Sequence, residues 1–204
     1  MVRTSVHSTA ALAALLASSA HAFTLTITNN CGSEIDVYLR QGGVYTDSVD
    51  TLASGASATH SIAKNFEGNF RNGSSTSATL VEFSTGGDYD LAWYDISIIP
   101  PELTSGHEYC MSLDDCKANS KTGVGFNTPV RITPLSNTNG DNCRELNCLA
   151  DYCEDAYTYP TDDLKTHSCA LETDFDGSVH AYDDTTGDEA ATATPTPKKT
   201  KYCV

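Results

Sequence analysis

Two acidic residues in the middle of the chain have a spacing that could support acid–base chemistry. The stretch from Thr79 to Ile99 reads TLVEFSTGGDYDLAWYDISII, in which a glycine-containing turn region separates two runs rich in strand-forming residues. If these runs pair as an antiparallel hairpin whose turn is centred after Asp88, Glu82 lies opposite Asp95. The Cβ atoms of opposed residues are about 4.5–5.5 Å apart. A slip of one residue would separate the two acids.

Opposed carboxyl groups beside an aromatic ring suit glycoside hydrolysis, because one acid protonates the leaving oxygen while the other activates water or attacks the sugar. The same register places Trp93 beside Glu82 and Asp95 and sends Tyr94 to the other face. Two like charges in opposition destabilise a sheet surface unless a cation or an altered pKa relieves them. Arg71, which ends the stretch NFR, is the expected cation. From these residues alone, an ordinary solvated strand face is the better interpretation.

A second pair of acids, Asp162 and Asp163, lies in the stretch CEDAYTYPTDDLKTHSC, which runs from Cys153 to Cys169. Adjacent carboxylates in a loop bounded by cysteines could belong to a binding site. They could equally be solvated turn residues, because Asp is common in turns. The stretch itself leaves both interpretations open.

The surrounding sequence predicts a chain built from short strands. FTLTIT, from Phe23, alternates apolar and polar residues with a period of two, and IDVYLR, from Ile35, does the same. Clusters such as QGG, LASGAS and TGGDYD are turn signals between such runs. Many short strands separated by turns are typical of an all-β sandwich. Further strand candidates are ATHSIA, GNFRNG, ATLVEFS, LAWYDISII, HEYCMSL and TPVRITPL, and a helical turn is expected from Leu146 to Tyr152.

The two ends of the chain differ in composition from the middle. Residues 1–22 combine Arg3, an apolar run from Ala10 to Leu16 and the pattern AHA, which together predict a secretory signal peptide cleaved before Phe23. The apolar run is shorter than the roughly 20 residues that span a bilayer. Residues 183–204 are acidic, then rich in Thr, Ala and Pro, then basic, which predicts a flexible tail. One domain is therefore expected over residues 23–182 of a secreted, extracellular protein with no membrane span.

The cysteine count also indicates a secreted protein. All eight cysteines lie beyond residue 22, and an even number in a secreted chain predicts disulfide bonds. A zinc site at the evenly spaced Cys143, Cys148 and Cys153 is the weaker alternative, because C-x2-C spacing and a nearby histidine pair are absent. We therefore expect no metal and no cofactor.

The charge of the chain limits its partners. The formal net charge is −15 over 204 residues. Nucleic acids and anionic membranes need a basic surface, so neither is expected as a partner. A neutral polysaccharide or a basic protein is compatible with this charge. The sequon Asn72-Gly73-Ser74 predicts an N-linked glycan in a surface turn.

Five motifs along the chain occur together in one known protein family. ITNNCGSEIDVYL reads as a pair of opening strands, and LASGASATHSI as a turn with Ala58 where that family usually has an aromatic residue. ATLVEFS followed by WYDIS is similar to TLAEF…DIS, CRELNCLAD to C-x4-C-x-A-D, and CEDAYTYPTDD to CPDAYSY…DD. Over residues 23–175 the chain thus resembles the thaumatin-like proteins, the osmotin and pathogenesis-related group.

The resemblance implies a thaumatin-like β-sandwich with disulfide-stapled loops and an acidic cleft. That cleft is lined in the family by an arginine, a glutamate and three aspartates. The third aspartate position is occupied here by Pro100, and nearby Glu102 is not assumed to replace it. We expect Glu82 and Asp95 as the catalytic pair, with Arg71, Asp162, Asp163, Trp93 and Tyr94 as binding residues.

The resemblance also implies the disulfide pairs, and the chain departs from the family in two places. Only LADY lies between Cys148 and Cys153, where larger members carry a cysteine-rich insertion, so the cleft is expected to be open on one side. The family's closing FCP strand is replaced by DFDGSVHAYDD, so the terminal strand is expected to be degenerate or missing. The implied pairs are Cys143 with Cys169, Cys148 with Cys153 and Cys31 with Cys203, which leaves Cys110 with Cys116.

Three functions remain open. The first is binding of β-1,3-glucan or another cell-wall polysaccharide by a monomeric, antifungal or defence-related protein, with Trp93, Tyr94, Tyr157 and Tyr159 contacting sugar rings. The second is a weak endo-β-1,3-glucanase, with Glu82 as general acid and Asp95 as base or nucleophile. The third is a secreted scaffold that binds a secreted or surface protein. The open cleft and Pro100 favour binding over hydrolysis.

Overall fold

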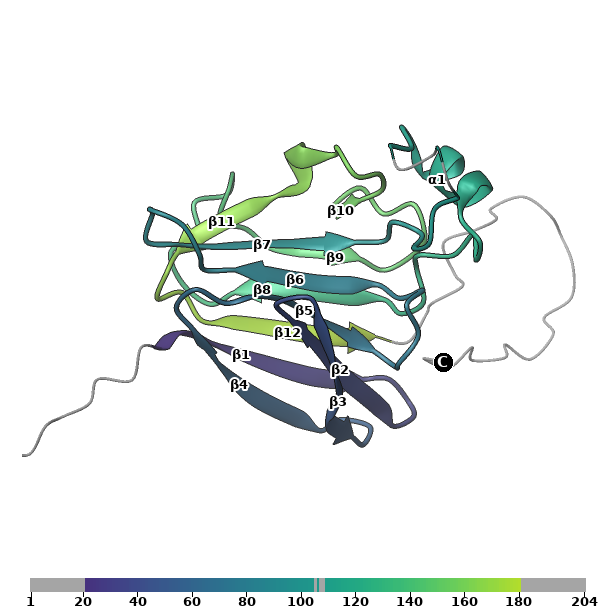
Figure 1. Ribbon diagram of the computed structural model, residues 1–204. Helices are drawn as coiled ribbons and strands as arrows, with labels where there is room; N and C mark the ends of the chain where they lie inside the picture. Colours follow the sequence, from purple (N-terminus) through teal and green to yellow (C-terminus); the bar gives the residue numbers. More distant parts are fainter. Residues whose placement is uncertain (1–20, 105, 107–108, 181–204) are drawn as a thin grey trace, which may run out of the picture.

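The computed structural model describes residues 21–104, 106 and 109–180, and within them two β-sheets pack face to face (Figure 1). The first sheet has the order β4 (Ser57–Ala63), β1 (His21–Asn30), β12 (Phe175–His180), β8 (Val130–Pro134) and β9 (Leu146–Cys148). The second has the order β10 (Ala156–Tyr157), β7 (Leu91–Ser97), β6 (Leu80–Ser84), β5 (Glu67–Asn72), β2 (Ile35–Gln41) and β3 (Val44–Leu52). A further strand, β11 (His167–Ala170), pairs with β7.

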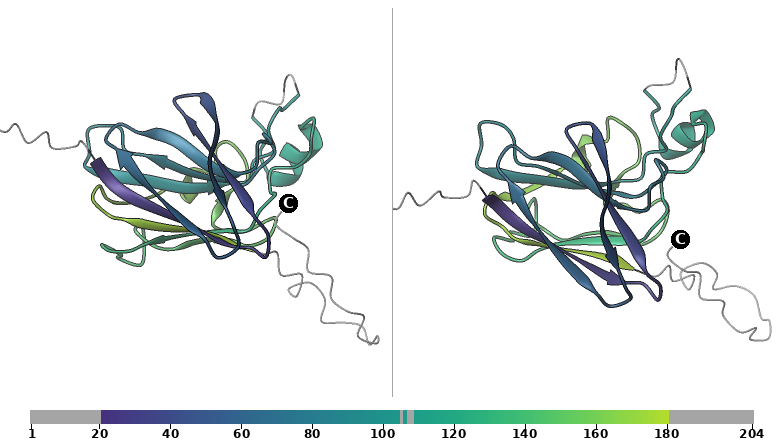
Figure 2. Two further views of the ribbon diagram at one scale, coloured as in Figure 1. Left: turned by 90° about the horizontal axis from the view of Figure 1, so that it is seen from below. Right: turned by 60° about the horizontal axis from the view of Figure 1, so that its bottom comes forward.

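Two short helices lie outside the sheets. Helix α1 (Leu113–Asn119) lies beyond one end of the two layers, as both views in Figure 2 show, and the 3₁₀ helix η1 (Asp163–Lys165) precedes β11. Most strand pairs are antiparallel, but β1 with β12 and β10 with β7 are parallel. The predicted all-β sandwich is confirmed. Within the described residues, no helix is long and apolar enough to cross a membrane.

The core between the sheets follows from the predicted alternation. Phe23 of β1 and Phe83 of β6 face each other across the two layers, with ring centroids 5.2 Å apart. Phe175 of β12 contacts both rings, at 5.0 Å from Phe23 and 5.2 Å from Phe83. Tyr94 of β7 completes the cluster, with its ring 5.0 Å from that of Phe175. Because β12 is the middle strand of the first sheet and Phe175 is fully buried, this ring is part of the core between the two sheets.

The terminal strand that we expected to be degenerate or missing is therefore present, and that expectation was wrong. Strand β12 pairs with β1 on one side and with β8 on the other. Its inward positions are Phe175, Gly177 and Val179, all buried, while Asp176 is exposed. An acid and a glycine obscure the strand pattern in the sequence, although the period of two is intact.

Two other expectations about local structure were wrong. HEYCMSL was predicted as a strand, but Ser112 caps α1 instead, its hydroxyl accepting a hydrogen bond from the Asp115 amide. Acidic residues in the first turn also favour the helix. The helical turn predicted from Leu146 begins as strand β9, which ends at Cys148.

Three of the four implied disulfide bonds are confirmed: Cys110–Cys116, Cys143–Cys169 and Cys148–Cys153. The zinc alternative for the cysteine trio is thereby ruled out, because its members are paired in disulfides. Cys203 lies outside the described residues, so its pairing with Cys31 remains a prediction. The predicted signal peptide and tail also lie outside the described residues, except for His21 and Ala22, which begin β1.

Truncating Phe175 tests whether β12 holds the core together. Phe175→Ala should lower the free energy of unfolding by about 3–5 kcal/mol, the usual cost of removing a buried phenylalanine ring. Urea denaturation followed by circular dichroism measures this. The matched control is Leu164→Ala, because Leu164 is 92% exposed and its loss should change stability by less than about 0.5 kcal/mol. A similarly small effect at both positions would contradict the described position of β12.

Candidate functional site

The opposition of Glu82 and Asp95 is present as predicted. Strands β6 and β7 pair antiparallel, with Glu82 facing Asp95 and Ser84 facing Trp93. The neighbouring position, Phe83, is buried in the core. The two acids therefore point to the opposite, outer face of the sheet.

The acids are part of a longer row of polar side chains that crosses four strands. Arg40 of β2 pairs with Asn69 of β5, Asn69 pairs with Glu82 of β6, and Glu82 pairs with Asp95 of β7. The Asn69 side-chain amide donates a hydrogen bond to Glu82 Oε1 at 3.4 Å. We refer to Arg40, Asn69, Glu82 and Asp95 as the polar row.

The polar row lines a cleft of about 440 Å³ on the outer face of the second sheet. Trp93 lies in this cleft beside the acids, and Thr166, which follows η1, lines it from the other side. At Gly68 a Cβ atom would lie 2.3 Å from the backbone oxygen of Arg40, so only glycine allows β2 and β5 to approach this closely. Gly42 and Gly43, in the turn between β2 and β3, and Glu67 of β5 complete the rim.

Burial and proximity raise the pKa of both acids. The pKa of Asp95 is raised to about 8, mainly because its carboxyl is buried, with the charge and the hydrogen bond of Glu82 adding to the shift. Burial also raises the pKa of Glu82, while hydrogen bonds from Asn69 and Asp95 and the charge of Arg40 oppose this. Asp95 Oδ1 is buried and has no hydrogen-bond partner among the described residues. The pKa of about 8 means that the Asp95 carboxyl keeps its proton at neutral pH, which removes the repulsion between the two acids.

The protonation of Asp95 determines which chemical groups the cleft can bind. A protonated carboxyl both donates and accepts hydrogen bonds, while an ionised carboxylate only accepts them. Asp95, Glu82 and Asn69 together offer donors and acceptors within one row, as vicinal hydroxyl groups require. Arg40 adds a positive charge that balances Glu82.

The expected cation, Arg71, is not in this row. Arg71 is 6% exposed, its guanidinium donates to the Ser74 backbone oxygen at 3.2 Å, and it is not among the residues that line the cleft. The cation that acts on Glu82 is Arg40, which was not among the expected site residues. Its place beside the acids depends on the pairing of β2 with β5, which the sequence does not give.

The aromatic residues of the prediction divide between cleft and core. Trp93 is half-buried and lines the cleft. Tyr94 was expected to contact a ligand, but this was wrong, because its side chain is 1% exposed and packs in the core. Its hydroxyl donates to the Arg144 backbone oxygen at 2.6 Å and accepts from the Arg144 amide at 2.9 Å.

The acids at 162 and 163 support the loop that borders the cleft. Asp162 Oδ2 accepts a hydrogen bond from the Thr158 hydroxyl at 3.0 Å, which closes the turn before η1. The Tyr157 hydroxyl donates to Asp163 Oδ1 at 3.4 Å and hydrogen-bonds the Thr166 hydroxyl. Neither aspartate lines the cleft, but their loop positions Thr166, which does.

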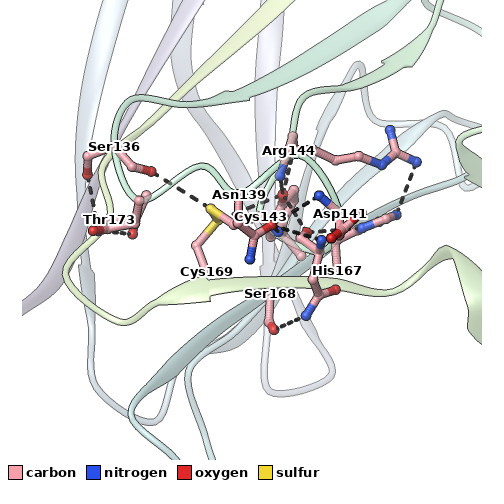
Figure 3. The surroundings of a disulfide bond; sticks show 12 residues. Ser136, Asn139, Asp141, Cys143, Arg144, His167, Ser168, Cys169 and Thr173 are labelled. Carbon is pink, nitrogen blue, oxygen red and sulfur yellow. Dashed lines mark hydrogen bonds between the residues drawn. A yellow bond between two sulfur atoms is a disulfide. The ribbon is translucent and has the colours of Figure 1, made fainter.

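The Cys143–Cys169 disulfide, whose surroundings are shown in Figure 3, holds the strand that pairs with β7. It joins β11, which pairs with β7, to the segment before β9. Beside it, Arg144 Nη2 donates to Asp155 Oδ1 at 2.8 Å and lies 3.3 Å from His167 Nε2. Burial, followed by the charge of Arg144, lowers the pKa of His167, so this imidazole is neutral at pH 7. The cluster is a partly buried brace beside β11.

Two remaining positions lie away from the cleft. Asn72, the predicted glycosylation site, ends β5, and its amide donates to the Thr128 hydroxyl at 3.1 Å. Glu102 is exposed and forms an ion pair with Lys121 at 3.3 Å. In the described part of the chain, no three His, Cys, Asp or Glu side chains converge as metal ligands.

Comparison with known proteins identifies relatives among plant proteins. The chain is 30% identical over 186 residues to thaumatin-like pathogenesis-related protein 4 of Avena sativa, covering 80% of this chain and 90% of that protein. It is 27% identical over 183 residues to a thaumatin-like protein of Oryza sativa subsp. japonica, covering 78% and 85%. No protein-family model matches the chain.

Comparison with solved structures finds two proteins of lower identity. The protein elicitor MoHrip2 from Magnaporthe oryzae is 19% identical, with a TM-score of 0.48, over 78% of this chain and 100% of that one. The thaumatin-like xylanase inhibitor TLXI is 15% identical, with a TM-score of 0.41, over 76% and 97%.

Replacing Asp95 by an uncharged isostere tests the raised pKa. The folded state keeps Asp95 protonated where the unfolded chain ionises it, from the ordinary aspartate pKa of 3.8 up to about 8. The contribution of the protonated Asp95 to the free energy of unfolding is therefore complete below the ordinary pKa of 3.8 and is lost as the pH rises to about 8. Asp95→Asn should therefore be more stable than the parent at pH 9, by about 1–3 kcal/mol, the cost of a buried unsatisfied polar group.

Urea denaturation of both proteins at pH 5, 7 and 9 makes this comparison. Both proteins carry His167, so its own titration cancels in the difference. Glu67→Gln is the matched control, because Glu67 is an exposed acid of the same cleft. A stability difference for Asp95→Asn that does not grow with pH would contradict the assignment.

Proposed function

This chain belongs to the thaumatin-like family, and from that premise we propose that its cleft binds β-1,3-glucan or a related neutral cell-wall polysaccharide. The observation that carries the proposal is the polar row beside Trp93 in a cleft of about 440 Å³. Ligand sites typically have volumes of about 300–1,000 Å³ and combine apolar walls with a few well-placed polar groups. The cleft has both features.

The chemistry of the polar row suits an uncharged sugar chain. Glu82 and Arg40 carry opposite charges, and the proton on Asp95 removes a second negative charge from the cleft floor. Sugar hydroxyls can then donate to Glu82 and accept from Asn69 or Asp95. The indole of Trp93 offers a large apolar surface with a polar edge, against which a sugar ring can pack.

We place this activity outside the cell. The predicted signal peptide and the three disulfide bonds of the described residues support secretion, because disulfides persist in oxidising compartments. One relative is named as pathogenesis-related, and an antifungal or defence role for this chain is proposed on that likeness. Binding of a wall polysaccharide by a monomer is the simplest activity that fits such a role.

Weak endo-β-1,3-glucanase activity is the second candidate, favoured by the raised pKa of Asp95. A protonated acid beside an ionised one is the pairing that a glycosidase needs. Glycosidases hold their two carboxyl groups about 5–5.5 Å or 6.5–9.5 Å apart, depending on the stereochemical outcome. Binding ranks first because only LADY lies between Cys148 and Cys153, which leaves the cleft open to water on one side, and because Pro100 occupies the position of the third aspartate.

The test is to incubate the purified protein with soluble and insoluble β-1,3-glucan and measure pelleted protein and new reducing ends together. We expect the protein to pellet without releasing reducing ends. Trp93 is the only tryptophan, so its fluorescence should change as soluble glucan is added.

Trp93→Ala should weaken glucan binding about tenfold or more, or roughly 1.4 kcal/mol, because the apolar wall of the cleft is lost. Tyr89→Ala is the control, because Tyr89 is a 72% exposed aromatic residue outside the cleft. New reducing ends that disappear in Glu82→Gln would instead make the protein a glucanase. If the protein neither pellets nor cleaves, the carbohydrate proposal fails.

A further inference from the structure

Two disulfide-closed loops, far apart in the sequence, are fastened together at α1. One is closed by Cys110–Cys116 and the other by Cys148–Cys153. The Tyr152 hydroxyl of the second loop donates to Asp114 Oδ1 of the helix at 2.5 Å. Lys117 of the helix pairs with Asp151 and lies 4.2 Å from the centre of the Tyr152 ring. These contacts hold the two loops in a fixed relation.

The fastened loops present apolar side chains to solvent. Met111 is 70% exposed, Tyr152 57% and Leu149 43%. We refer to these three residues as the loop patch. Tyr152 has a φ of 67°, in the left-handed region that a bulky residue rarely adopts. Such conformations cost about 1–3 kcal/mol and persist where the surroundings impose them, often at binding sites.

Acidic groups surround the loop patch. Asp114, Asp151 and Glu154 are exposed, and Asp115 is partly buried beside them in the helix. Two basic side chains contact these loops: Lys117 pairs with Asp151, and Lys165 Nζ donates to the Glu154 backbone oxygen, so the four acids still outnumber them. A partner for this surface must therefore supply positive charge as well as apolar groups.

We propose that the loop patch is a docking site for a basic polypeptide segment that carries apolar side chains. Leu149 and the flexible thioether of Met111 would cover the partner's apolar side chains, and methionine adapts to irregular shapes. The carboxylates of Asp114, Asp151 and Glu154 would pair with its Lys or Arg residues and speed association. A nucleic acid or an anionic membrane would be repelled by the same charges.

This site is separate from the glucan cleft. None of the three loop-patch residues lines the cleft, which is bordered by β2, β5, β6, β7 and the loop after η1. The two sites also have separate natural reporters. Trp93, the only tryptophan, lies in the cleft, and Met111 is the only methionine after Met1.

The experiment uses the full secreted protein, labelled with ¹³C at the methionine methyl groups, and a synthetic amphipathic Lys/Leu peptide as probe. Addition of the peptide should shift the Met111 methyl signal and leave Trp93 fluorescence unchanged. A Glu/Leu peptide of the same pattern should shift neither. Soluble β-1,3-glucan should leave the Met111 signal in place, so failure of one site is distinguishable from failure of the other.

Two double variants test whether the peptide binds at the loop patch. The double variant Met111→Ser, Leu149→Ser should weaken peptide binding about tenfold by fluorescence anisotropy. The control is Tyr89→Ser, Leu164→Ser, because both residues are exposed, at 72% and 92%, and each adjoins an acidic residue. The control should bind the peptide within about twofold of the parent. All four positions are exposed, so unfolding is not expected, and urea denaturation checks this.

Several results would overturn the proposal. Equal weakening in both double variants would mean that the peptide binds the acidic chain without a specific site. A Met111 signal that moves when Lys198, Lys199 and Lys201 are replaced by Glu, without peptide, would mean that the chain's own tail occupies the loop patch. A signal that moves with protein concentration alone would assign the surface to a second copy of the chain.

Discussion

The direct opposition of Glu82 and Asp95 is the constraint on which the site depends. Two carboxyl groups at one rung of a β-ladder are unfavourable when both are ionised. The register that brings them together is fixed by the core, since Phe83 and Tyr94 occupy the adjacent rung and are buried. A one-residue shift in the register of β6 and β7 that separated the two acids would also turn the Phe83 and Tyr94 rings toward solvent. The hydrophobic core therefore holds the acids in place, and a shared proton relieves their repulsion.

The rest of the second sheet extends and supports this pair. Asn69 and Arg40 continue the rung across β5 and β2, so that a donor and a positive charge lie on the side of Glu82. On the other side, β11 and the Cys143–Cys169 disulfide hold β7, and the loop through η1 places Thr166 at the cleft. The site is thus built on strands and braced loops, which suits a binding surface that keeps its shape.

The parts that could be predicted were those fixed by short-range alternation. The turn after Asp88 sets the hairpin register, and the period of two does the rest, so Glu82 and Asp95 were placed correctly. Arg40 could not be placed in the same way, because β2 pairs with β5 across a long stretch of chain and the sequence does not give strand order. Arg71 was expected because it ends the stretch NFR and matches the arginine of the family's cleft, but its side chain donates to the Ser74 backbone oxygen and does not line the cleft.

Other misses have similar causes. Strand β12 was overlooked because its exposed positions carry Asp176 and its buried ones include Gly177, yet it is central once β1 and β8 provide partners. The start of α1 was hidden by apolar residues that suggested a strand, although Ser112 followed by acids was a capping signal. Tyr94 was grouped with binding residues for its aromatic ring, although the alternation itself places it in the core. These expectations were wrong because the chemical type of a residue was given more weight than its position in the alternation pattern.

The most direct test of the raised Asp95 pKa is a ¹³C NMR titration of the Asp95 carboxyl group in the folded protein, with Glu82→Gln as the comparison. The midpoint should be about 8 in the parent. In Glu82→Gln the midpoint should fall but stay above the ordinary range for aspartate, because burial is the larger cause of the shift. An Asp95 midpoint near the ordinary aspartate pKa of 3.8 in both proteins would contradict the shared proton and the cleft chemistry built on it.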